Sequence, residues 1–388
     1  MGYLTITTPN FAKKIDKTLP SIFFDLDHTI IFPKNKKRFY HKTDPTDYVF
    51  RPLVIETFKK TLDDYVIYIV TNQIKYDIVI RDRIELVLRD LRSQIPGLNL
   101  CVIISTERDF YRKPAPGMVL ESGIPGHQPT IIKSKSFHCG DAAGRTASGT
   151  GEVKSSPVPP ADFSDDDLWF ANHVGIKFFT PEEVFNPDFK FGRVTPYKPP
   201  KIEIDTILVS QLKEVYYNYD GLILVGLPGS GKSYVRRWYE KHFSGPKTLI
   251  VWNKDEKLPK SRMTDRLKAE FLHTPNAFHI FDNTNLREIE RMEIERSEIK
   301  RSDPGSVGTA PPSRLTTFAT FATMYIDIDR KEAIRGVKYR TLMEGGLYVP
   351  DVVINTMNKN KEPPVNPEIL LLNKRPILES SFPPYLLI

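Results

Sequence analysis

Short apolar runs alternate with longer amphipathic segments along the first half of the chain. The runs at 22–24, 65–72, 98–106 and 136–141 are rich in aromatic and β-branched residues, which is typical of buried strands. Between two of them, residues 74–92 carry apolar side chains at helical spacing and charged side chains on the other face. This alternation predicts a parallel α/β sheet with the intervening helix packed against it.

A second pattern of the same kind occupies the rest of the chain. It begins with an apolar run and an amphipathic helical segment and continues through five more apolar runs, at 221–226, 233–243, 248–253, 277–283, 323–329, 351–356 and 368–373. We therefore expect an α/β fold of two domains, each a mainly parallel sheet flanked by helices, with a strand at each apolar run.

A change in composition separates the two patterns. Residues 186–204 carry four prolines and few helix or strand signals, which is typical of a semi-rigid connector. We expect an N-terminal extension at 1–20, a first domain at 21–190, a linker leading into the second domain at 191–220, and a second domain at 221–388. Two stretches rich in Ser, Gly and Pro have too few apolar residues to pack, at 144–166 and 301–314.

Composition narrows the class of protein. The 388 residues include 55 basic and 48 acidic side chains, and the net charge of +7 favours polyanionic partners without requiring them. The two cysteines, Cys101 and Cys139, are too few for a disulfide framework and fit a reducing compartment. The N-terminus lacks an apolar leader, and no run of about 18 apolar residues occurs. We expect a soluble, intracellular protein with no membrane partner.

A glycine-rich loop, GLPGSGKS, follows the first apolar run of the second domain and matches G-x-x-x-x-G-K-[ST]. Gly226, Gly229 and Gly231 are expected to let backbone N–H groups wrap phosphates at the start of a helix, whose dipole favours anions. Lys232 would reach the outer phosphates, and the Ser233 hydroxyl would bind Mg²⁺. The motif predicts a nucleotide site.

Two carboxylates at strand ends can face the same crevice as these phosphates. Asp255 and Asp282 each follow an apolar run, and such an aspartate can accept the proton of an acceptor hydroxyl. On a predicted helix further along, Lys338 and Arg340 form either a lid over the phosphates or an ordinary charged surface. The charge-rich segment 287–301 is expected to be a solvated helix face.

The first domain offers a different set of phosphate-handling residues. Asp25 and Asp27 stand in D-x-D-x-T, in which the first carboxylate attacks phosphorus and the second manages protons. Thr71 offers a hydroxyl to a phosphate oxygen, and Lys113 offers positive charge to the phosphoryl group and to Asp25. We expect Asp25, Asp141 and the backbone carbonyl of Asp27 to hold Mg²⁺, which prefers hard oxygen donors. The alternative is acidic residues at helix caps and turns.

The ordered set of Asp, Thr, Lys and Asp resembles the haloacid dehalogenase superfamily of phosphatases and transferases. Over about 21–185 and 221–355, the chain is similar to the polynucleotide kinase 3′-phosphatase family, with the phosphatase first. The resemblance is carried by FDLDHT, TDYVFRP, TNQ, YRKP, GDAAGR, DFSDDD with VGIKFFTPEEVF, GLPGSGKS and DNTN, of which YRKP and GDAAGR are much more specific than the superfamily motifs. It implies removal of a 3′-phosphate from a nucleic-acid end by the first domain. For the second domain it implies phosphorylation of a 5′-hydroxyl with ATP.

The resemblance also implies roles for single residues. Asp25 is the nucleophile, and Asp27 is the general acid and base. Asp255 takes the place of the base that activates the 5′-hydroxyl, and Arg340 resembles the lid arginine. Asp167 matches a further acidic position of the phosphatase motifs, in a supporting role.

The chain departs from the family at several positions. His28 stands where the family commonly has glycine, so the loop after Asp27 is expected to be less permissive. Lys254 replaces an arginine before the base, and Lys338 replaces one in the lid. The second half diverges more, especially at 258–275. The sequence therefore supports the expected kinase activity less strongly than the expected phosphatase activity.

The basic run at 33–42 follows the D-x-D-x-T loop as a predicted hairpin. It could guide a nucleic-acid strand by phosphate contacts, with Phe39 or Tyr40 stacking on a base. A solvated loop, or part of a nuclear targeting signal, is the alternative. By the resemblance we expect DNA ends as partners, RNA ends as a further option, a monomer and a nuclear location in DNA repair. Because only about twenty residues are available before the phosphatase motifs, we expect no forkhead-associated domain there.

Three alternatives remain open at this point. The chain could be a 3′-phosphatase whose kinase-like domain binds nucleotide without transfer. It could be a non-catalytic binder of nucleic-acid ends, although a binder has no use for a nucleophile beside a metal ligand. It could also be a kinase and phosphatase pair acting on small molecules such as sugars.

Overall fold

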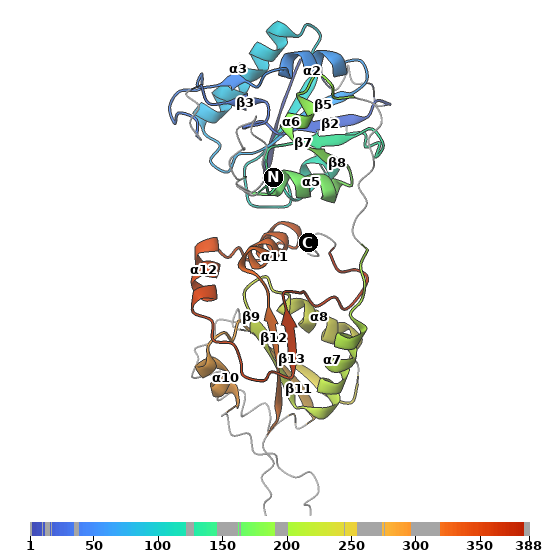
Figure 1. The fold of residues 1–388 in the computed structure, drawn as a ribbon, viewed down its shortest axis with the longest axis vertical. Helices are drawn as coiled ribbons and strands as arrows, with labels where there is room; N and C mark the ends of the chain where they lie inside the picture. Colours follow the sequence, from blue (N-terminus) through green and yellow to red (C-terminus); the bar gives the residue numbers. More distant parts are fainter. Residues whose placement is uncertain are drawn as a thin grey trace, which may run out of the picture. The chain divides into compact units, whose positions relative to one another are not determined.

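The structure is a computed structural model, and the chain divides in it into two compact units. The first is formed by residues 1–199 and 341–346, and the second is formed by residues 200–340 and 347–388 (Figure 1). The description covers residues 2–9, 11, 16, 18–34, 39–121, 128–145, 162, 164–190, 201–243, 245–253, 274, 276–295 and 319–383. Each unit is a mainly parallel sheet flanked by helices, so the predicted fold class is confirmed.

The sheet of the first unit has the strand order β1-β6-β5-β2-β7-β8. Its strands are β1 (Tyr3–Thr7), β2 (Ser21–Phe24), β5 (Val66–Asn72), β6 (Leu100–Ser105), β7 (Phe137–Cys139) and β8 (Lys177–Phe179). Only β1 runs antiparallel to its neighbour among these described strands. A small antiparallel pair stands apart, β3 (Ile31–Phe32) with β4 (Val49–Phe50). The predicted runs at 22–24, 65–72, 98–106 and 136–141 all contain strands.

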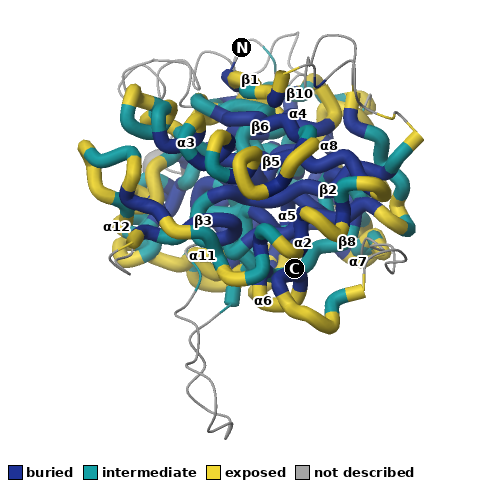
Figure 2. Tube along the Cα trace, turned by 90° about the horizontal axis from the view of Figure 1, so that it is seen from above, coloured by how far each residue is buried: buried dark blue, intermediate teal, exposed yellow. Residues whose placement is uncertain are grey.

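Helices cover both faces of this sheet because alternate strand residues point to opposite sides. The first unit has helices α2 (Val54–Thr61), α3 (Ile78–Gln94), α4 (Gly117–Leu120), α5 (Asp166–Val174) and α6 (Pro181–Val184). Ile22 and Phe24 pack in one core with residues of α2 and α3, whereas Phe23 packs in the other with residues of α4 and α5. Figure 2 shows β2, β5 and β6 as buried strands.

The topology brings three strand ends to one edge. β2 pairs in parallel with β5 on one side and with β7 on the other. The residues that follow these strands therefore lie at the same carboxyl edge, where ligands bind in open α/β sheets. Asp25, Thr71 and Asp141 are placed together by this arrangement.

β1 and α3 differ from what the sequence leads us to expect. Tyr3–Thr7 forms the edge strand β1, within the segment that the pattern leaves outside the first domain. Its run is short, and only Tyr3 of the five residues is buried, so it gives little hydrophobic signal. The helix expected from residue 74 begins at Ile78 as α3, because the Asp77 side chain caps it by accepting the N–H of Ile80.

The second unit has five parallel strands in the order β10-β11-β9-β12-β13. They are β9 (Gly221–Gly226), β10 (Thr248–Trp252), β11 (Ala277–Asp282), β12 (Phe321–Asp327) and β13 (Ile369–Leu372). Figure 1 shows α7 (Thr206–Asn218) and α8 (Lys232–His242) on one side of this sheet, and α10 (Glu288–Glu295) and α12 (Asp351–Lys359) on the other. A further helix, α11 (Arg330–Met343), follows β12.

Two expectations for the second unit need correction. The run at 351–356 is not a strand: it opens α12, whose only buried residue is Ile354, after Pro350. In α10, Arg291 and Ile294 are buried, so the described part of the segment 287–301 is not simply a solvated face. Residues 206–218, in the stretch expected to lead into the second domain, form α7, which Asp205 caps and which packs into the core of the second unit.

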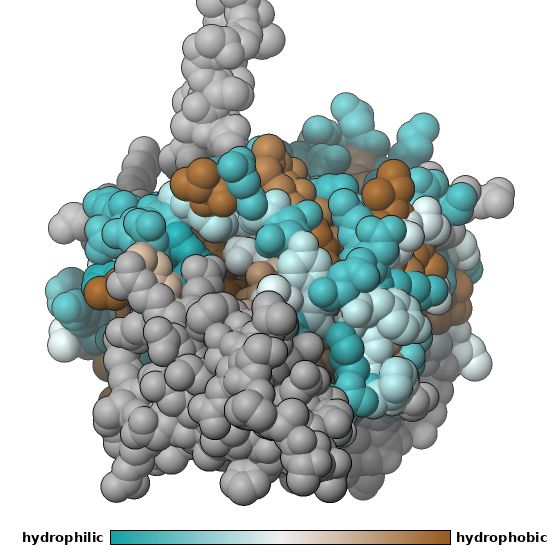
Figure 3. Space-filling view, turned by 90° about the horizontal axis from the view of Figure 1, so that it is seen from below, coloured by the Kyte–Doolittle hydropathy of each residue, from teal (hydrophilic) through white to brown (hydrophobic). Residues whose placement is uncertain are grey.

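Among the described residues, no helix is long and apolar enough to cross a membrane. The described part of the surface seen from below in Figure 3 is largely hydrophilic, with separate apolar patches.

Candidate active sites

Asp25 lies directly after β2, in the interior of the first sheet. Lys113 Nζ donates a hydrogen bond to Asp25 Oδ1 at 2.5 Å and another to Asp167 Oδ1 at 2.7 Å. The Lys113 side chain is 3% exposed. Because the ammonium group is shielded from water, removing either carboxylate would leave a buried charge poorly paired. Lys113 is therefore fixed between Asp25 and Asp167.

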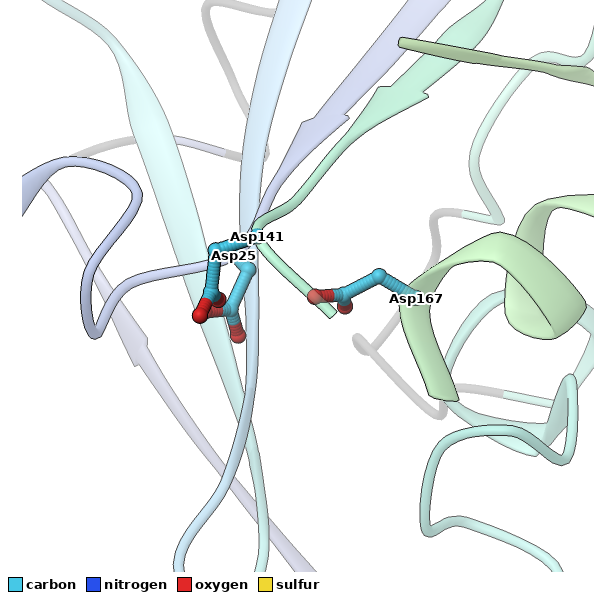
Figure 4. A group of neighbouring side chains, drawn as sticks. All are labelled: Asp25, Asp141 and Asp167. Atoms are coloured by element: carbon cyan, nitrogen blue, oxygen red, sulfur yellow. The ribbon is translucent and has the colours of Figure 1, made fainter. Parts of the chain in front are cut away.

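Asp141 follows β7 and brings a third carboxylate to this point. Oxygen atoms of Asp25, Asp141 and Asp167 lie within 4.8 Å of one another. Figure 4 shows Asp25 and Asp141 side by side, with Asp167 pointing toward them from the start of α5. Asp167 already accepts N–H groups from Lys113 and from Ala142, the latter at 3.1 Å. Asp25 and Asp141 are thus better placed than Asp167 to bind a cation.

The three carboxyl groups differ in their proton affinity. Burial raises the pKa of Asp25 well above its usual range; Asp167 and Asp141 raise it further, and Lys113 opposes them. Burial, with the charge of Asp167 next, raises the pKa of Asp141 to about 7. Burial also raises the pKa of Asp167, but Lys113 and His138 outweigh it and bring that pKa below its usual range. A divalent cation would stabilise the charged forms of Asp25 and Asp141.

His138 and Gly140 explain how Asp167 reaches this position. His138, in β7, is buried; its Nε2 lies 2.9 Å from Asp167 Oδ1 and its Nδ1 lies 3.2 Å from the Phe23 carbonyl oxygen. A Cβ at Gly140 would lie 2.3 Å from the Asp167 carboxyl carbon. Glycine at this position therefore leaves the space that Asp167 occupies.

Asp27 and Thr71 are joined by a residue that the sequence analysis did not single out. Gln73 Nε2 donates to Asp27 Oδ2 at 2.6 Å and to Thr71 Oγ1 at 3.0 Å. Thr71 is buried at the end of β5. The structure thus brings together all five predicted side chains of the first site, Asp25, Asp27, Thr71, Lys113 and Asp141.

The loop before β4 does not fit one part of its predicted role. Tyr40 is packed: its hydroxyl lies 3.0 Å from the Ile31 carbonyl oxygen, and the guanidinium of Arg83 lies 4.3 Å from its ring centroid. Arg83 already occupies one face of the Tyr40 ring, so this side chain is less available than Phe39 to stack on a base. Phe39 is 69% exposed. Residues 35–38 of the basic run lie outside the described residues.

The glycine-rich loop of the second unit joins β9 to α8. Gly226, Gly229 and Gly231 have φ angles of 156°, 79° and 107°. Gly229 also approaches α11 closely: a Cβ there would lie 2.2 Å from the Ala333 carbonyl oxygen. Left-handed backbone and this close approach both require glycine. The motif therefore has the local structure that its sequence predicts.

Lys232 and Ser233 lie at the start of α8. Lys232 is buried, and its Nζ donates to the carbonyl oxygens of Gly226 at 2.8 Å and Leu227 at 2.7 Å. The Ser233 hydroxyl donates to Asp282 Oδ1 at 3.3 Å. Asp282, at the end of β11, thus faces the phosphate loop as the sequence predicts.

The structure describes the predicted lid arginine of the second unit but not the predicted base. Arg340, on α11, donates through Nη2 to the Leu347 carbonyl oxygen at 2.9 Å. Burial lowers the pKa of Lys232 to about 8; the charge of Asp282 opposes this, and the positive charge of Arg340 reinforces it. Arg340 therefore acts electrostatically on Lys232 within the second unit. Asp255 and Lys254 lie outside the described residues.

Residues 21–185 match the family model described as polynucleotide kinase 3 phosphatase. A protein of Acanthamoeba polyphaga mimivirus, with the name of a bifunctional polynucleotide phosphatase/kinase, is 28% identical over 69% of this chain and 66% of its own length. The bifunctional polynucleotide phosphatase/kinase of Schizosaccharomyces pombe is 30% identical over 57% of this chain and 51% of its own. The chain belongs to the polynucleotide kinase 3′-phosphatase family.

The similarity to each relative includes only part of that relative's length. The polynucleotide 3′-phosphatase ZDP of Arabidopsis thaliana is 42% identical over 20% of this chain, which is 10% of the plant protein. The chain thus spans about two thirds of the mimivirus relative and about half of the fission yeast relative. Asp25 lies within residues 21–185, the segment of this polynucleotide kinase 3′-phosphatase family member that matches the family model.

Sequence reasoning missed Gln73, His138 and Asn72 in this family member. Asn72 lies between Thr71 and Gln73, and its amide bonds the backbone of Lys113 twice. Polar residues directly after a buried strand were the available signal for Asn72 and Gln73. A histidine inside the apolar run before Asp141 was the signal for His138.

Proposed function

We propose that this chain heals nucleic-acid ends: the first unit removes 3′-phosphates, and the second phosphorylates 5′-hydroxyls with ATP. The observation that carries the proposal is the Lys113 ammonium group, held between Asp25 and Asp167 beside Asp141. A carboxylate with a neighbouring cation and a second carboxylate suits attack on a phosphorylated substrate. DNA ends, a repair role in the nucleus and action as a monomer belong to the same proposal.

The first reaction is divided between Asp25 and Asp27. An oxygen of Asp25 attacks phosphorus, and the bond between phosphorus and the 3′ oxygen breaks while that oxygen takes a proton from Asp27. Asp27 then takes a proton from water, whose oxygen attacks phosphorus and returns the bonding electrons to Asp25. Lys113 offsets the negative charge around Asp25, and Thr71 donates its hydroxyl hydrogen to a phosphate oxygen.

The donor set around Asp25 fits Mg²⁺. The carboxylates of Asp25 and Asp141 supply the hard oxygens that this ion prefers. Burial first, and the neighbouring carboxylates after it, raise the pKa of both groups, and a bound cation would offset both effects. We propose that Asp25, Asp141 and the Asp27 carbonyl hold the ion, while Asp167 holds Lys113. When bound, Mg²⁺ would stabilise negative charge on the phosphoryl oxygens.

In the second unit, the glycine-rich loop is proposed to bind ATP through its backbone N–H groups, with Lys232 at the outer phosphates. Ser233 and Asp282 lie together and would hold the accompanying Mg²⁺. Asp255 is proposed as the base for the 5′-hydroxyl, and Arg340 as the lid arginine.

Two substitutions test whether each unit carries one of the two activities. In Asp25→Asn, 3′-dephosphorylation of an oligonucleotide should fall to background while 5′-phosphorylation continues, and Lys232→Ala should give the reverse. Asp82→Asn and Lys241→Ala, on the surfaces of α3 and α8, are the matched controls. Loss of both activities in either folded variant would contradict the two-site proposal. Matched DNA and RNA ends in the same assay decide the nucleic acid.

A phosphatase with an inactive kinase-like unit is the second candidate. It is favoured by Lys232, whose Nζ is bound to two carbonyls of its own loop. Transfer of labelled γ-phosphate to a 5′-hydroxyl oligonucleotide decides between the two, since the second candidate gives no labelled product. A sugar phosphate that outcompetes the 3′-phosphorylated oligonucleotide would instead indicate a small-molecule substrate.

A further inference from the structure

The carboxyl group of Asp27 is bordered by side chains from two separate segments. Gln73 Nε2, after β5, donates to Asp27 Oδ2 at 2.6 Å. The Tyr40 hydroxyl, from the loop before β4, lies beside this carboxyl group and donates its hydrogen to the Ile31 carbonyl oxygen at 3.0 Å. The Gln73 amide N–H therefore satisfies a lone pair of the carboxyl oxygens, and Tyr40 limits the space in which the carboxyl group can turn.

Both side chains are themselves held in place. The Gln73 backbone N–H donates to the Ser105 carbonyl oxygen at 2.7 Å, which anchors Gln73 beside β6. Arg83 of α3 lies over the Tyr40 ring at 4.3 Å and donates to the His41 carbonyl oxygen at 3.2 Å. Arg83 is buried, so the Tyr40 ring packs against an anchored side chain of α3.

We propose that Gln73 and Tyr40 are positioning residues that aim the Asp27 carboxyl group at the leaving oxygen of the substrate. The inference rests on the proposed phosphatase function. As the Asp25 oxygen bonds to phosphorus, the bond from phosphorus to the leaving oxygen breaks, and that oxygen receives the Asp27 proton. Proton transfer requires hydrogen-bond distance and direction, and a freely rotating carboxyl group would seldom provide both.

The leaving group gives this role a distinctive signature. The 3′ oxygen of a sugar leaves as a strongly basic alkoxide unless it is protonated, so its departure depends on the position of Asp27. p-Nitrophenolate is a much weaker base and leaves without a proton. Loss of positioning should therefore slow the first turnover with a 3′-phosphorylated oligonucleotide and spare the first turnover with p-nitrophenyl phosphate.

The experiment compares Tyr40→Phe and Gln73→Met with wild type in single-turnover reactions on the two substrates. Each variant should cleave the oligonucleotide about tenfold more slowly, which is a part of the roughly 100- to 10,000-fold that a general acid contributes. Release of the first p-nitrophenolate should stay within about twofold of wild type. Tyr48→Phe and Gln94→Met are matched controls, because the Tyr48 hydroxyl donates to Asp90 Oδ2 at 2.6 Å and Gln94 Nε2 to the Asp90 carbonyl oxygen at 3.4 Å.

Three results separate this inference from the proposed function. Equal slowing of both substrates would show a general structural role for Gln73 and Tyr40 and would overturn the inference, as would wild-type rates on both in the two variants. In either case the phosphatase proposal stands. If wild type with Mg²⁺ cleaves neither substrate, the phosphatase proposal fails and the inference fails with it.

Discussion

The side chain of Asn72 makes two hydrogen bonds to the backbone of Lys113. Its Nδ2 donates to the Lys113 carbonyl oxygen and its Oδ1 accepts the Lys113 N–H, each at 3.0 Å. Asn72 ends β5, whereas Lys113 lies in a loop 41 residues further along the chain. The rigid strand end thus fixes the position of the lysine that reaches Asp25.

Asn72→Ala should lower phosphatase activity through this relationship. Without the amide, the Lys113 backbone loses both partners, and a shift of its ammonium group by about 1 Å would reduce kcat about 10- to 100-fold. Steady-state kinetics on a 3′-phosphorylated oligonucleotide measures the effect. Asn99→Ala is the control, since the Asn99 side chain instead accepts from the Thr8 hydroxyl at 2.8 Å. Unchanged kcat in Asn72→Ala would mean that Lys113 is held by its carboxylate partners alone.

Substitutions of His28 are expected to change the free energy of unfolding in a specific pattern. Its φ of 57° lies in the left-handed region, and Arg51 Nη2 donates to its carbonyl oxygen at 2.9 Å. His28→Gly relieves about 1 kcal/mol of strain but also gives the unfolded chain more freedom. We expect its unfolding free energy to stay within about 1 kcal/mol of wild type. His28→Val should cost at least about 1 kcal/mol more, because a β-branched residue tolerates this conformation poorly. If urea unfolding gives the two variants equal unfolding free energies, the backbone at His28 is not strained.

Gly336→Ala tests the contact between α11 and the phosphate loop. A Cβ at Gly336 would lie 2.1 Å from the Gly229 carbonyl oxygen, so the loop must shift. We expect affinity for ATP with Mg²⁺ to fall at least about tenfold, as overpacking of about 1.4 kcal/mol implies. Calorimetric titration measures this, and Lys331→Ala, at an exposed position of α11, should bind as wild type. Retained affinity in Gly336→Ala would show that ATP binding does not depend on this conformation of the phosphate loop.

His279 predicts a pH dependence for the second unit. Burial lowers its pKa to about 4, and its Nδ1 accepts the Trp252 indole N–H at 2.9 Å. The folded state therefore binds fewer protons than the unfolded state, whose histidine titrates near 6.5. Stability is full above that value and falls as the pH drops from 6.5 toward 4, by on the order of 3 kcal/mol.

Hydrogen exchange of β11 peptides in the full chain, corrected for intrinsic rates, measures this loss between pH 7 and pH 5. His279→Gln removes the titrating group, so the difference between the two pH values should shrink. An equal difference in wild type and His279→Gln would assign the pH dependence to other groups.

Local pattern predicts much of this fold because most strands are continuous apolar runs beside amphipathic helices. β1 and β8 are exceptions in the first unit, since these edge strands bury too little surface to leave a strong pattern. The segment 351–356 is the opposite case: Val352 and Val353 are apolar but exposed in α12, so hydrophobicity alone suggests a strand that tertiary packing does not make.

Motif spacing predicts the residue types of the first site but not how they are held. Asp25, Thr71 and Asp141 could be placed together because parallel strands end at one edge. The bonds from Asn72 to Lys113 and from Gln73 to Asp27 join segments far apart in the sequence. Such pairings depend on side-chain geometry, which no periodicity encodes.

The central claim is that Asp25 attacks phosphorus. Wild type mixed with a 3′-phosphorylated oligonucleotide carrying radiolabelled phosphate should, after rapid acid quenching, retain acid-stable label on the protein. Borohydride reduction of this acyl phosphate should convert Asp25 to homoserine, which peptide mass spectrometry can locate. The account predicts homoserine at position 25 in wild type and none in Asp25→Asn. Labelled phosphate released at the normal rate with no modified Asp25 would contradict it.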